Sequence, residues 1–412
     1  MHKKTDNLSP ILGRRHRHMC ADNRRAILDC LRRQSEPVTA LEISRQIKLS
    51  RTLVMLSLYD FMREKLAKTT GKDEAATEGG PRPKLFVFNA LSGFVLVSEI
   101  MPDHLYSALV DMAGNIRQST ETPLCATWTG TVVLQKIAEN YRTLMAVAKT
   151  NVSKLRAIAI GAHGITDAAK GQVLVAPHFP NWETGLDIGA RLRAELNADV
   201  PVHVDNLIRF MAYAALADNQ YDTRERLVLL WVKDGVVAGL LDGNRVEHGR
   251  HNLAGEIGHM ILDPAAVEPC QCGGRGCFEE KISPQRILRL VREWANRHPN
   301  APLAKTGATT LADVLLAAAA GDALANAILE DVAQWFAVAI VNLMLTFDPQ
   351  RVVIHGIYNT PSGLVIPKIR AAVARHPLMR HTQDSLVIES SPFSAKHSVI
   401  GAARYAINQH FA

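Results

Sequence analysis

The most informative segment of the sequence is Cys270-Gln271-Cys272-Gly273-Gly274-Arg275-Gly276-Cys277, which begins eleven residues after His259. Its glycines allow the backbone to turn tightly around an ion. Three thiolates and one imidazole are the ligands of a closed tetrahedral zinc site, which is structural because no coordination position is left for water. The alternative is three unrelated buried cysteines. The spacing favours metal, and we predict one structural zinc ion per chain, bound by His259, Cys270, Cys272 and Cys277.

Two carboxylates accompany this segment. Glu256 and His259 are three residues apart and would share a face of a helical turn, and Glu279 follows two residues after the last cysteine. Carboxylates and an imidazole suit the hydroxyl groups of a sugar. One nitrogen of His259 would bind the metal while the other faces the ligand. Alternatively, both carboxylates only support the zinc loop.

The positive charge of the chain is concentrated near its N-terminus. Residues 1–90 contain 18 Lys and Arg against 10 Asp and Glu, whereas the other 322 residues contain 29 against 30. A basic segment on a neutral body indicates a module that binds a polyanion, with nucleic acid as the first candidate. The alternative is a basic solvated tail.

The sequence predicts a cytoplasmic protein without membrane insertion. Residues 1–20 are polar and basic and lack the apolar core of a signal peptide. The longest uncharged apolar run, Val332 to Phe347, has 16 residues, whereas a membrane span needs about 20, so it predicts a buried core helix. Six cysteines in 412 residues do not make a disulfide scaffold.

The first ninety residues have the pattern of a helix-turn-helix. Apolar residues recur at helical spacing over Asn23–Arg33. Thr39 and Glu42 form a capping box for a second helix over about 40–47. After a short turn, Ser50 caps a third helix that runs to about Leu66. Helix, short helix, tight turn and helix is the order found in DNA-binding domains of this type.

An α/β region follows. The polar segment 69–84 and the strand 85–88 are typical of a wing, and we place the end of the DNA-binding domain at residue 89. Strands and helices then alternate over 90–412, which predicts sheets covered by helices. The predicted strands are 94–97, 106–110, 157–160, 202–204, 227–232, 236–241, 352–354 and 386–388. The predicted helices are 132–148, 185–196, 208–217, 284–296, 311–319, 323–345, 365–374 and 397–407.

These motifs together resemble a known family. Asn252-Leu253-Ala254-Gly255-Glu256-Ile257-Gly258-His259, followed by the cysteine segment and Glu279, resembles the signature of the ROK family of repressors and sugar kinases. The segments LSRTLVMLSLYDFMREKL (49–66) and GGPRPKLFVFN (79–89) look like the winged helix-turn-helix and linker of its NagC/Mlc/XylR regulators.

The resemblance implies a fold and a site. It implies a two-lobed, actin-like ATPase domain over 90–412, with lobe 1 at about 90–205 plus a C-terminal helix at 397–410 and lobe 2 at about 206–390. It also implies homodimers or homotetramers. The family's sugar-binding positions correspond to Gly164, Asn206, Glu256, His259 and Glu279, and its zinc ligands to the four residues given above.

The residues that a kinase needs are altered. Sugar phosphorylation requires a general base, which in the family is the Asp of an Asn-Asp pair. Aligned on Asn206, this position is Leu207, which cannot accept a proton, although a shift of one residue would bring Asp205 into play. The phosphate-binding loops have lost glycines at 97–103 and at 236–237. We therefore predict no catalytic residues and no kinase activity.

The sequence thus predicts a sugar- or sugar-phosphate-responsive transcriptional regulator, in the usual sense of the subgroup a repressor of carbohydrate genes. Ser50, Arg51 and Thr52 would meet operator DNA at the start of the third helix, with Ser50 mainly a cap. Arg82 would enter a minor groove or act as a plain linker charge. The alternatives are an active sugar kinase with a DNA-binding appendage, and a regulator controlled by a protein partner such as a sugar transporter.

Overall fold

The computed structural model describes residues 23–72, 83–217, 221–222, 224–233, 235–299, 303, 310–359, 363–382, 385–394 and 396–411. The chain forms two compact units. The first comprises the N-terminal part of the chain up to Ile160, together with Pro177–Val204 and the residues from Ala403 onward. The second comprises Gly161–Ala176 and Asp205–Ala402.

The first unit begins with a winged helix-turn-helix. Residues 23–32 are helical and are followed by α2 (Ala40–Ile47) and α3 (Arg51–Arg63). The predicted caps are confirmed: Thr39 and Glu42 form a capping box, and the Ser50 hydroxyl accepts a hydrogen bond from the Leu53 N–H. Lys48, with φ of 55°, makes the left-handed turn between α2 and α3.

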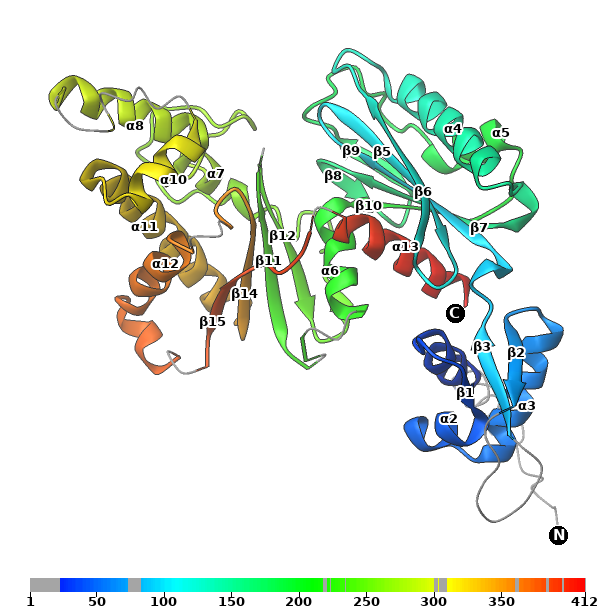
Figure 1. Cartoon of the computed structure of the whole chain (residues 1–412). Helices are drawn as coiled ribbons and strands as arrows, with labels where there is room; N and C mark the ends of the chain where they lie inside the picture. The colour runs from blue at the N-terminus through cyan, green and yellow to red at the C-terminus, as the bar shows by residue number, and fades with distance from the viewer. Residues whose placement is uncertain are drawn as a thin grey trace, which may run out of the picture. The chain divides into compact units, whose positions relative to one another are not determined.

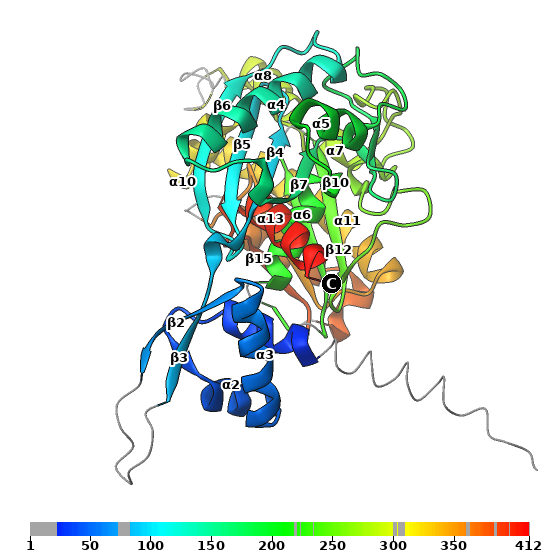
Figure 2. The ribbon, with the colours of Figure 1, turned by 90° about the vertical axis from the view of Figure 1, so that its right-hand side faces the viewer.

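The wing is an antiparallel hairpin of β2 (Ala67–Lys72) and β3 (Lys84–Phe88), and it lies beside α3 (Figures 1 and 2). The short strand β1 (Val38–Thr39) pairs with the other edge of β3. The predicted loop at 69–84 was therefore too long at its start, because β2 reaches Lys72. The small core beneath these elements is closed by large apolar side chains: Ile27, Leu31, Ile43, Val54, Leu58, Phe61 and Phe86.

A five-stranded sheet follows, in the order β10-β7-β4-β5-β6. The helices α4 (Gly130–Val147) and α5 (Ile188–Leu196) pack together on it, α4 against β5 and β6 (Figure 1). The sequence prediction missed β6, in which alternate residues are exposed and most are polar. The strands are β4 (Phe94–Ile100), β5 (His104–Asp111), β6 (Ile116–Pro123), β7 (Leu155–Ala162) and β10 (Val202–Asn206).

The second unit contains another five-stranded sheet, in the order β13-β12-β11-β14-β15. The side chains of β11 alternate between its faces. Leu227 and Leu229 pack with α6 (Leu207–Ala217), whereas Val228 and Leu230 pack with α11 (Ala323–Thr346), on the opposite face (Figure 1). The strands are β11 (Arg226–Val232), β12 (Val236–Asp242), β13 (Arg245–Val246), β14 (Arg351–Gly356) and β15 (Val387–Ser390).

Further helices complete this unit. Among the described residues, α11 is the one helix that is long and apolar enough to cross a membrane. Its most apolar stretch of 18 residues is 61% buried, and the helix forms much of the core of this unit. A small hairpin, β8 (Ile165–Asp167) and β9 (Gln172–Val175), precedes the sheet in the sequence. The remaining helices of this unit are α7 (Phe278–Lys281), α8 (Pro284–Arg297), α10 (Leu311–Ala319) and α12 (Val365–Ala374). The C-terminal helix α13 (His397–His410) begins in this unit, and its residues from Ala403 onward belong to the first unit.

Candidate metal and ligand site

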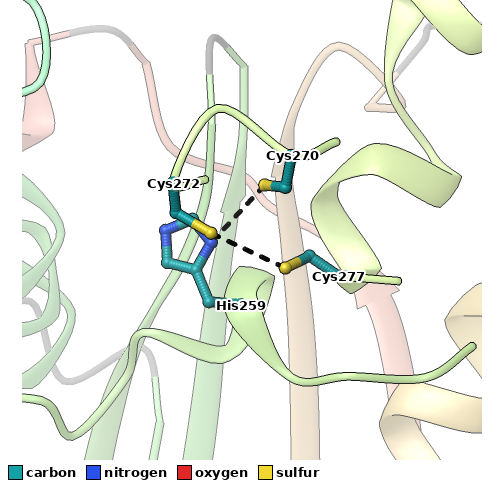
Figure 3. A group of neighbouring side chains, drawn as sticks. All are labelled: His259, Cys270, Cys272 and Cys277. Carbon is teal, nitrogen blue, oxygen red and sulfur yellow. Dashed lines mark hydrogen bonds between the residues drawn. The ribbon is translucent and has the colours of Figure 1, made fainter. Parts of the chain in front are cut away.

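The four predicted metal ligands lie together in the second unit. His259 ends the short helix η3 (Ile257–His259), and the cysteines lie in the loop before α7. Their ligand atoms are all within 4.8 Å of one another, and the imidazole and the three sulfurs point toward one another in Figure 3. Cys270 Sγ lies 3.8 Å from His259 Nδ1, and Cys272 Sγ lies 3.8 Å from Cys277 Sγ. A tetrahedral site with metal–sulfur bonds of about 2.3 Å has edges of about 3.8 Å, so the cluster fits such an ion.

The backbone of the loop holds the cysteines in this arrangement. The Cys270 N–H donates to the Gly274 carbonyl at 2.8 Å, and the Gly273 N–H donates back to the Cys270 carbonyl at 2.9 Å. Gly276 has φ of +72°, and a Cβ there would lie 2.0 Å from the Asp263 carbonyl oxygen. A side chain at Gly276 would therefore displace the neighbouring backbone and the adjacent ligand Cys277.

The two buried thiols of the cluster, Cys270 and Cys277, differ from the exposed Cys272, whose pKa is lowered. Burial raises the pKa of the Cys270 thiol to about 12, and burial also raises the pKa of the Cys277 thiol. Thiolates are the metal-binding form, so an ion must displace protons that these buried sulfurs otherwise keep at neutral pH. Metal binding at this cluster is therefore coupled to proton release.

The two acidic residues differ in their surroundings. The Glu279 carboxylate accepts a hydrogen bond from the Val236 N–H at 2.8 Å, and its other oxygen lies 3.8 Å from Cys270 Sγ. Glu279 therefore joins the cysteine loop to the start of β12, as a supporting residue would. Glu256 is half-buried, and within the described parts of the chain its carboxylate makes no hydrogen bond. Burial raises the pKa of Glu256, and the nearby Glu279 carboxylate acts in the same direction, whereas the Arg209 guanidinium opposes them.

Gly164 and Asn206 contact each other. The Asn206 side-chain amide donates to the Gly164 carbonyl at 2.8 Å, and its side-chain oxygen accepts from the Ile208 N–H at 3.0 Å. Asn206 ends β10, and Gly164 has φ of +94°, a conformation that favours glycine. This pair, Glu256, His259 and Glu279 all lie in the second unit. Their contacts with a sugar stay a prediction.

Asp205 is fully engaged in a buried network. Its Oδ1 accepts hydrogen bonds from the Asn206 N–H at 2.8 Å, from Arg209 Nη1 at 3.1 Å and from the Thr166 hydroxyl at 3.2 Å. Its Oδ2 lies 2.8 Å from His248 Nε2. The side chains of Asp205 and Arg209 are 5% and 3% exposed. Both oxygens of this carboxylate are occupied by hydrogen-bond partners within the protein, so the one-residue shift does not place a free carboxylate at the base position.

Arg209 extends this network to the signature segment. Its Nη2 donates to the Asn252 carbonyl at 2.9 Å and to the Ala254 carbonyl at 3.2 Å. The guanidinium thus links the β10–α6 junction, which carries Asn206, to the segment that leads into Glu256. We did not predict the role of Arg209 or His248 from the sequence. The only available signal was the i,i+4 spacing of Asp205 and Arg209.

Leu207 occupies the first position of α6 and is 3% exposed. It packs on β7: a Cβ at Gly161 would come within 2.6 Å of Leu207 Cδ2. A side chain so placed fills apolar space and has no group that accepts a proton. The structure thus gives Leu207 a packing role.

The segments expected to bind phosphate also differ from open glycine loops. The strand β4 stays paired with β5 up to Ile100, and the turn is closed by the Met101 N–H, which donates to the His104 carbonyl. In the second unit, His355 and Gly356 stand where the family resemblance expects a pair of glycines. The His355 ring lies against Trp231 with 4.9 Å between centroids, and its Nδ1 lies 3.1 Å from the Ser391 hydroxyl. Side chains therefore occupy the ends of β11 and β14.

The predicted DNA contacts divide into three groups. Ser50 caps α3, the role favoured for it from the sequence. Arg51 and Thr52 are exposed at the start of α3, as a base-reading position requires. Arg82 lies outside the described residues, so its predicted groove contact is untested.

Comparison with known proteins assigns the chain to a family. The model of the ROK family matches residues 100–409. The chain belongs to the ROK family. It is 28% identical over 277 residues to a glucokinase of Halalkalibacterium halodurans, covering 66% of this chain and 83% of that protein. It is 24% identical over 367 residues to the DNA-binding transcriptional dual regulator NagC of Escherichia coli, covering 87% and 86%.

Comparison with solved structures tests the predicted fold. The crystal structure of a ROK family transcriptional regulator, a homologue of the E. coli Mlc protein, matches with a TM-score of 0.77 and 24% identity. The match covers 96% of this chain and 97% of that chain. It therefore includes the winged helix-turn-helix as well as the α/β part, and the predicted fold class is confirmed.

Proposed function

We propose that this protein is a sugar-responsive, DNA-binding transcriptional repressor of genes for carbohydrate uptake or catabolism and that it has no kinase activity. The observation that carries the proposal is the combination of a winged helix-turn-helix with a ROK domain in which the buried Leu207 stands where the family resemblance expects the general base. Similarity to NagC and to an Mlc homologue, each over most of the chain, supports it.

The DNA side of the proposal rests on α3 and the charge around it. Arg51 and Thr52 would reach base edges in the major groove, and the wing would lie along the backbone. Over 23–72 and 83–90 there are twelve Lys and Arg against five Asp and Glu, so the domain carries the positive charge that phosphates require. Such domains read paired half-sites, for which the chain would act as a homodimer or homotetramer in the cytoplasm.

The ligand side rests on the second unit. We propose that a sugar or sugar phosphate binds at Gly164, Asn206, Glu256, His259 and Glu279. Glu256, half-buried and without a hydrogen bond among the described residues, would accept one from a sugar hydroxyl. His259 would hold a zinc ion through Nδ1, the nitrogen that faces Cys270, and offer Nε2 to the ligand. The zinc would be structural, with all four positions taken by protein.

Repression relieved by ligand requires that the sugar bind more tightly to the form that does not bind DNA. The experiment measures affinity for duplexes from the region upstream of the protein's own gene at one fixed salt concentration, since salt alone shifts such affinities by orders of magnitude. Hexoses, amino sugars, pentoses and their phosphates are tested one by one. A tenfold change, about 1.4 kcal/mol of coupling, would identify the inducer.

The same preparation tests the alternatives. Similarity to a glucokinase favours a second candidate, an active kinase, which predicts ADP release from ATP with one of the same sugars. We expect none, and sustained turnover would contradict the proposal. Tight DNA binding that no sugar changes would instead favour release by a protein partner such as a sugar transporter. Absence of DNA binding under all these conditions would refute the proposal that the protein is a repressor.

A further inference from the structure

The outer face of α3 carries one apolar side chain that no core explains. Leu56 is 60% exposed, although it sits in the middle of the helix. Its neighbours Leu53 and Met55 are packed against the core of the winged domain, whereas Leu56 is not part of that cluster. A single exposed leucine is ordinary on a protein surface, so its meaning depends on the residues around it.

The rest of this face has few groups that read bases by hydrogen bonds. Arg51 and Thr52 are exposed at the N-terminal end, and Thr52 lies one turn before Leu56 on the same face. At the far end, Arg63 is paired with Asp60. Between them the exposed side chains are Leu56 and Tyr59. The middle of the helix therefore has no amide or free guanidinium for the bidentate contacts that specify adenine or guanine.

Tyr59 is held by the wing. Lys84 Nζ donates to the Tyr59 hydroxyl at 3.3 Å and lies 5.1 Å from the centre of its ring. This ring also makes a T-shaped contact with Phe86, with 6.5 Å between centroids. Because Tyr59 is tied to β3, Leu56 is the unengaged side chain at the centre of the face, with basic residues on both sides of it.

From this arrangement, and resting on the DNA binding proposed above, we infer that Leu56 is a specificity-determining residue that contacts the 5-methyl group of thymine in the major groove. Among the four bases only thymine presents a methyl group there, and apolar side chains recognise it by contact. The positive charge of the domain would bring the helix to the duplex, and Leu56 would select T·A at the base pair next to the one that Thr52 meets.

The test uses uracil, which keeps every hydrogen-bonding group of thymine and lacks only the methyl. Duplexes are first enriched by the full-length protein from a random-sequence library. In the best duplex each thymine is then replaced by deoxyuridine, one position at a time. We expect one position per half-site at which uracil weakens binding about fourfold, the effect of leaving one methyl-sized group unburied. Other positions should be tolerant.

The variant Leu56→Ala assigns the effect to the residue. Alanine favours helix and the site is exposed, so the fold should be kept. Leu56→Ala should bind thymine and uracil duplexes equally, whereas the control Leu41→Ala, a 38% exposed leucine on α2, should keep the fourfold difference. Uracil tolerated at every position, or a thymine preference that survives in Leu56→Ala, would overturn the inference while DNA binding stands. If no duplex is enriched, the proposed repressor function fails, and the inference fails with it.

Discussion

Arg209 gives the sharpest test of the buried network, through the substitution Arg209→Met, which keeps the length and removes the charge. The guanidinium neutralises Asp205, whose side chain is 5% exposed, and donates to the carbonyls of Asn252 and Ala254. Removing one member of a buried ion pair leaves an uncompensated charge and typically costs about 3–5 kcal/mol of unfolding free energy. We expect a loss in that range for the second unit.

The assay must report that unit alone, because a chain of two units need not unfold in one step. In a Trp128→Phe/Trp182→Phe background the other three of the five tryptophans all lie in the second unit, so fluorescence in urea follows its unfolding. The control is Lys368→Met, which removes an ion pair to the half-exposed Glu330 and should cost less than about 1 kcal/mol.

Adding Asp205→Asn distinguishes charge from packing. If the loss comes from the uncompensated carboxylate, the double variant Arg209→Met/Asp205→Asn should be less destabilised than the sum of the two single variants, because the buried negative charge is gone. A loss below about 1 kcal/mol for Arg209→Met, or strict additivity in the double variant, would refute the reasoning.

Three further predictions follow from the sites. Purified protein should contain one zinc per chain, and Cys272→Ala should lose it, with acidification speeding metal release from the wild type because protons compete for the sulfurs; metal-free protein of unchanged melting temperature would contradict this. Ser50→Ala removes the cap of α3 and should lower the stability of that helix by about 1 kcal/mol, so binding to all duplexes should weaken alike. Ser50→Asp, which can still cap, should keep the helix. Gly255→Ala should disrupt the second unit because its Cβ would lie 2.0 Å from the Ala238 carbonyl oxygen, whereas Gly321→Ala, with a similar positive φ and open space, should be far milder in thermal unfolding.

The N-terminal domain could be predicted from short sequence patterns, chiefly its helix caps. Thr39 with Glu42 and Ser50 are caps whose chemistry acts within four residues, and the structure has each of them. The strand β6 was missed because half of its residues face solvent and most are polar, so no apolar pattern marks it. β6 is a strand because it pairs with β5, its neighbour in the sheet, and the residues of β6 alone do not predict that pairing.

The metal cluster and the Asp205 network show that contacts between residues near in sequence can be predicted, whereas contacts between distant residues cannot. The spacing of the cysteines predicts a shared ion because all but one of the ligands lie within eight residues, so local backbone geometry brings them together.

In the Asp205 network, by contrast, Asp205 and His248 are 43 residues apart, and the Arg209 contacts to Asn252 and Ala254 span similar separations. Nothing in those separations predicts contact. Only the folded β10–α6 junction shows that the carboxylate one residue before Asn206 is held by Arg209 and is not available as a base. If Leu207 stands at the position of the family's general base, as the resemblance implies, its nearest substitute Asp205 is already engaged, and we expect that Leu207→Asp alone would not produce a kinase.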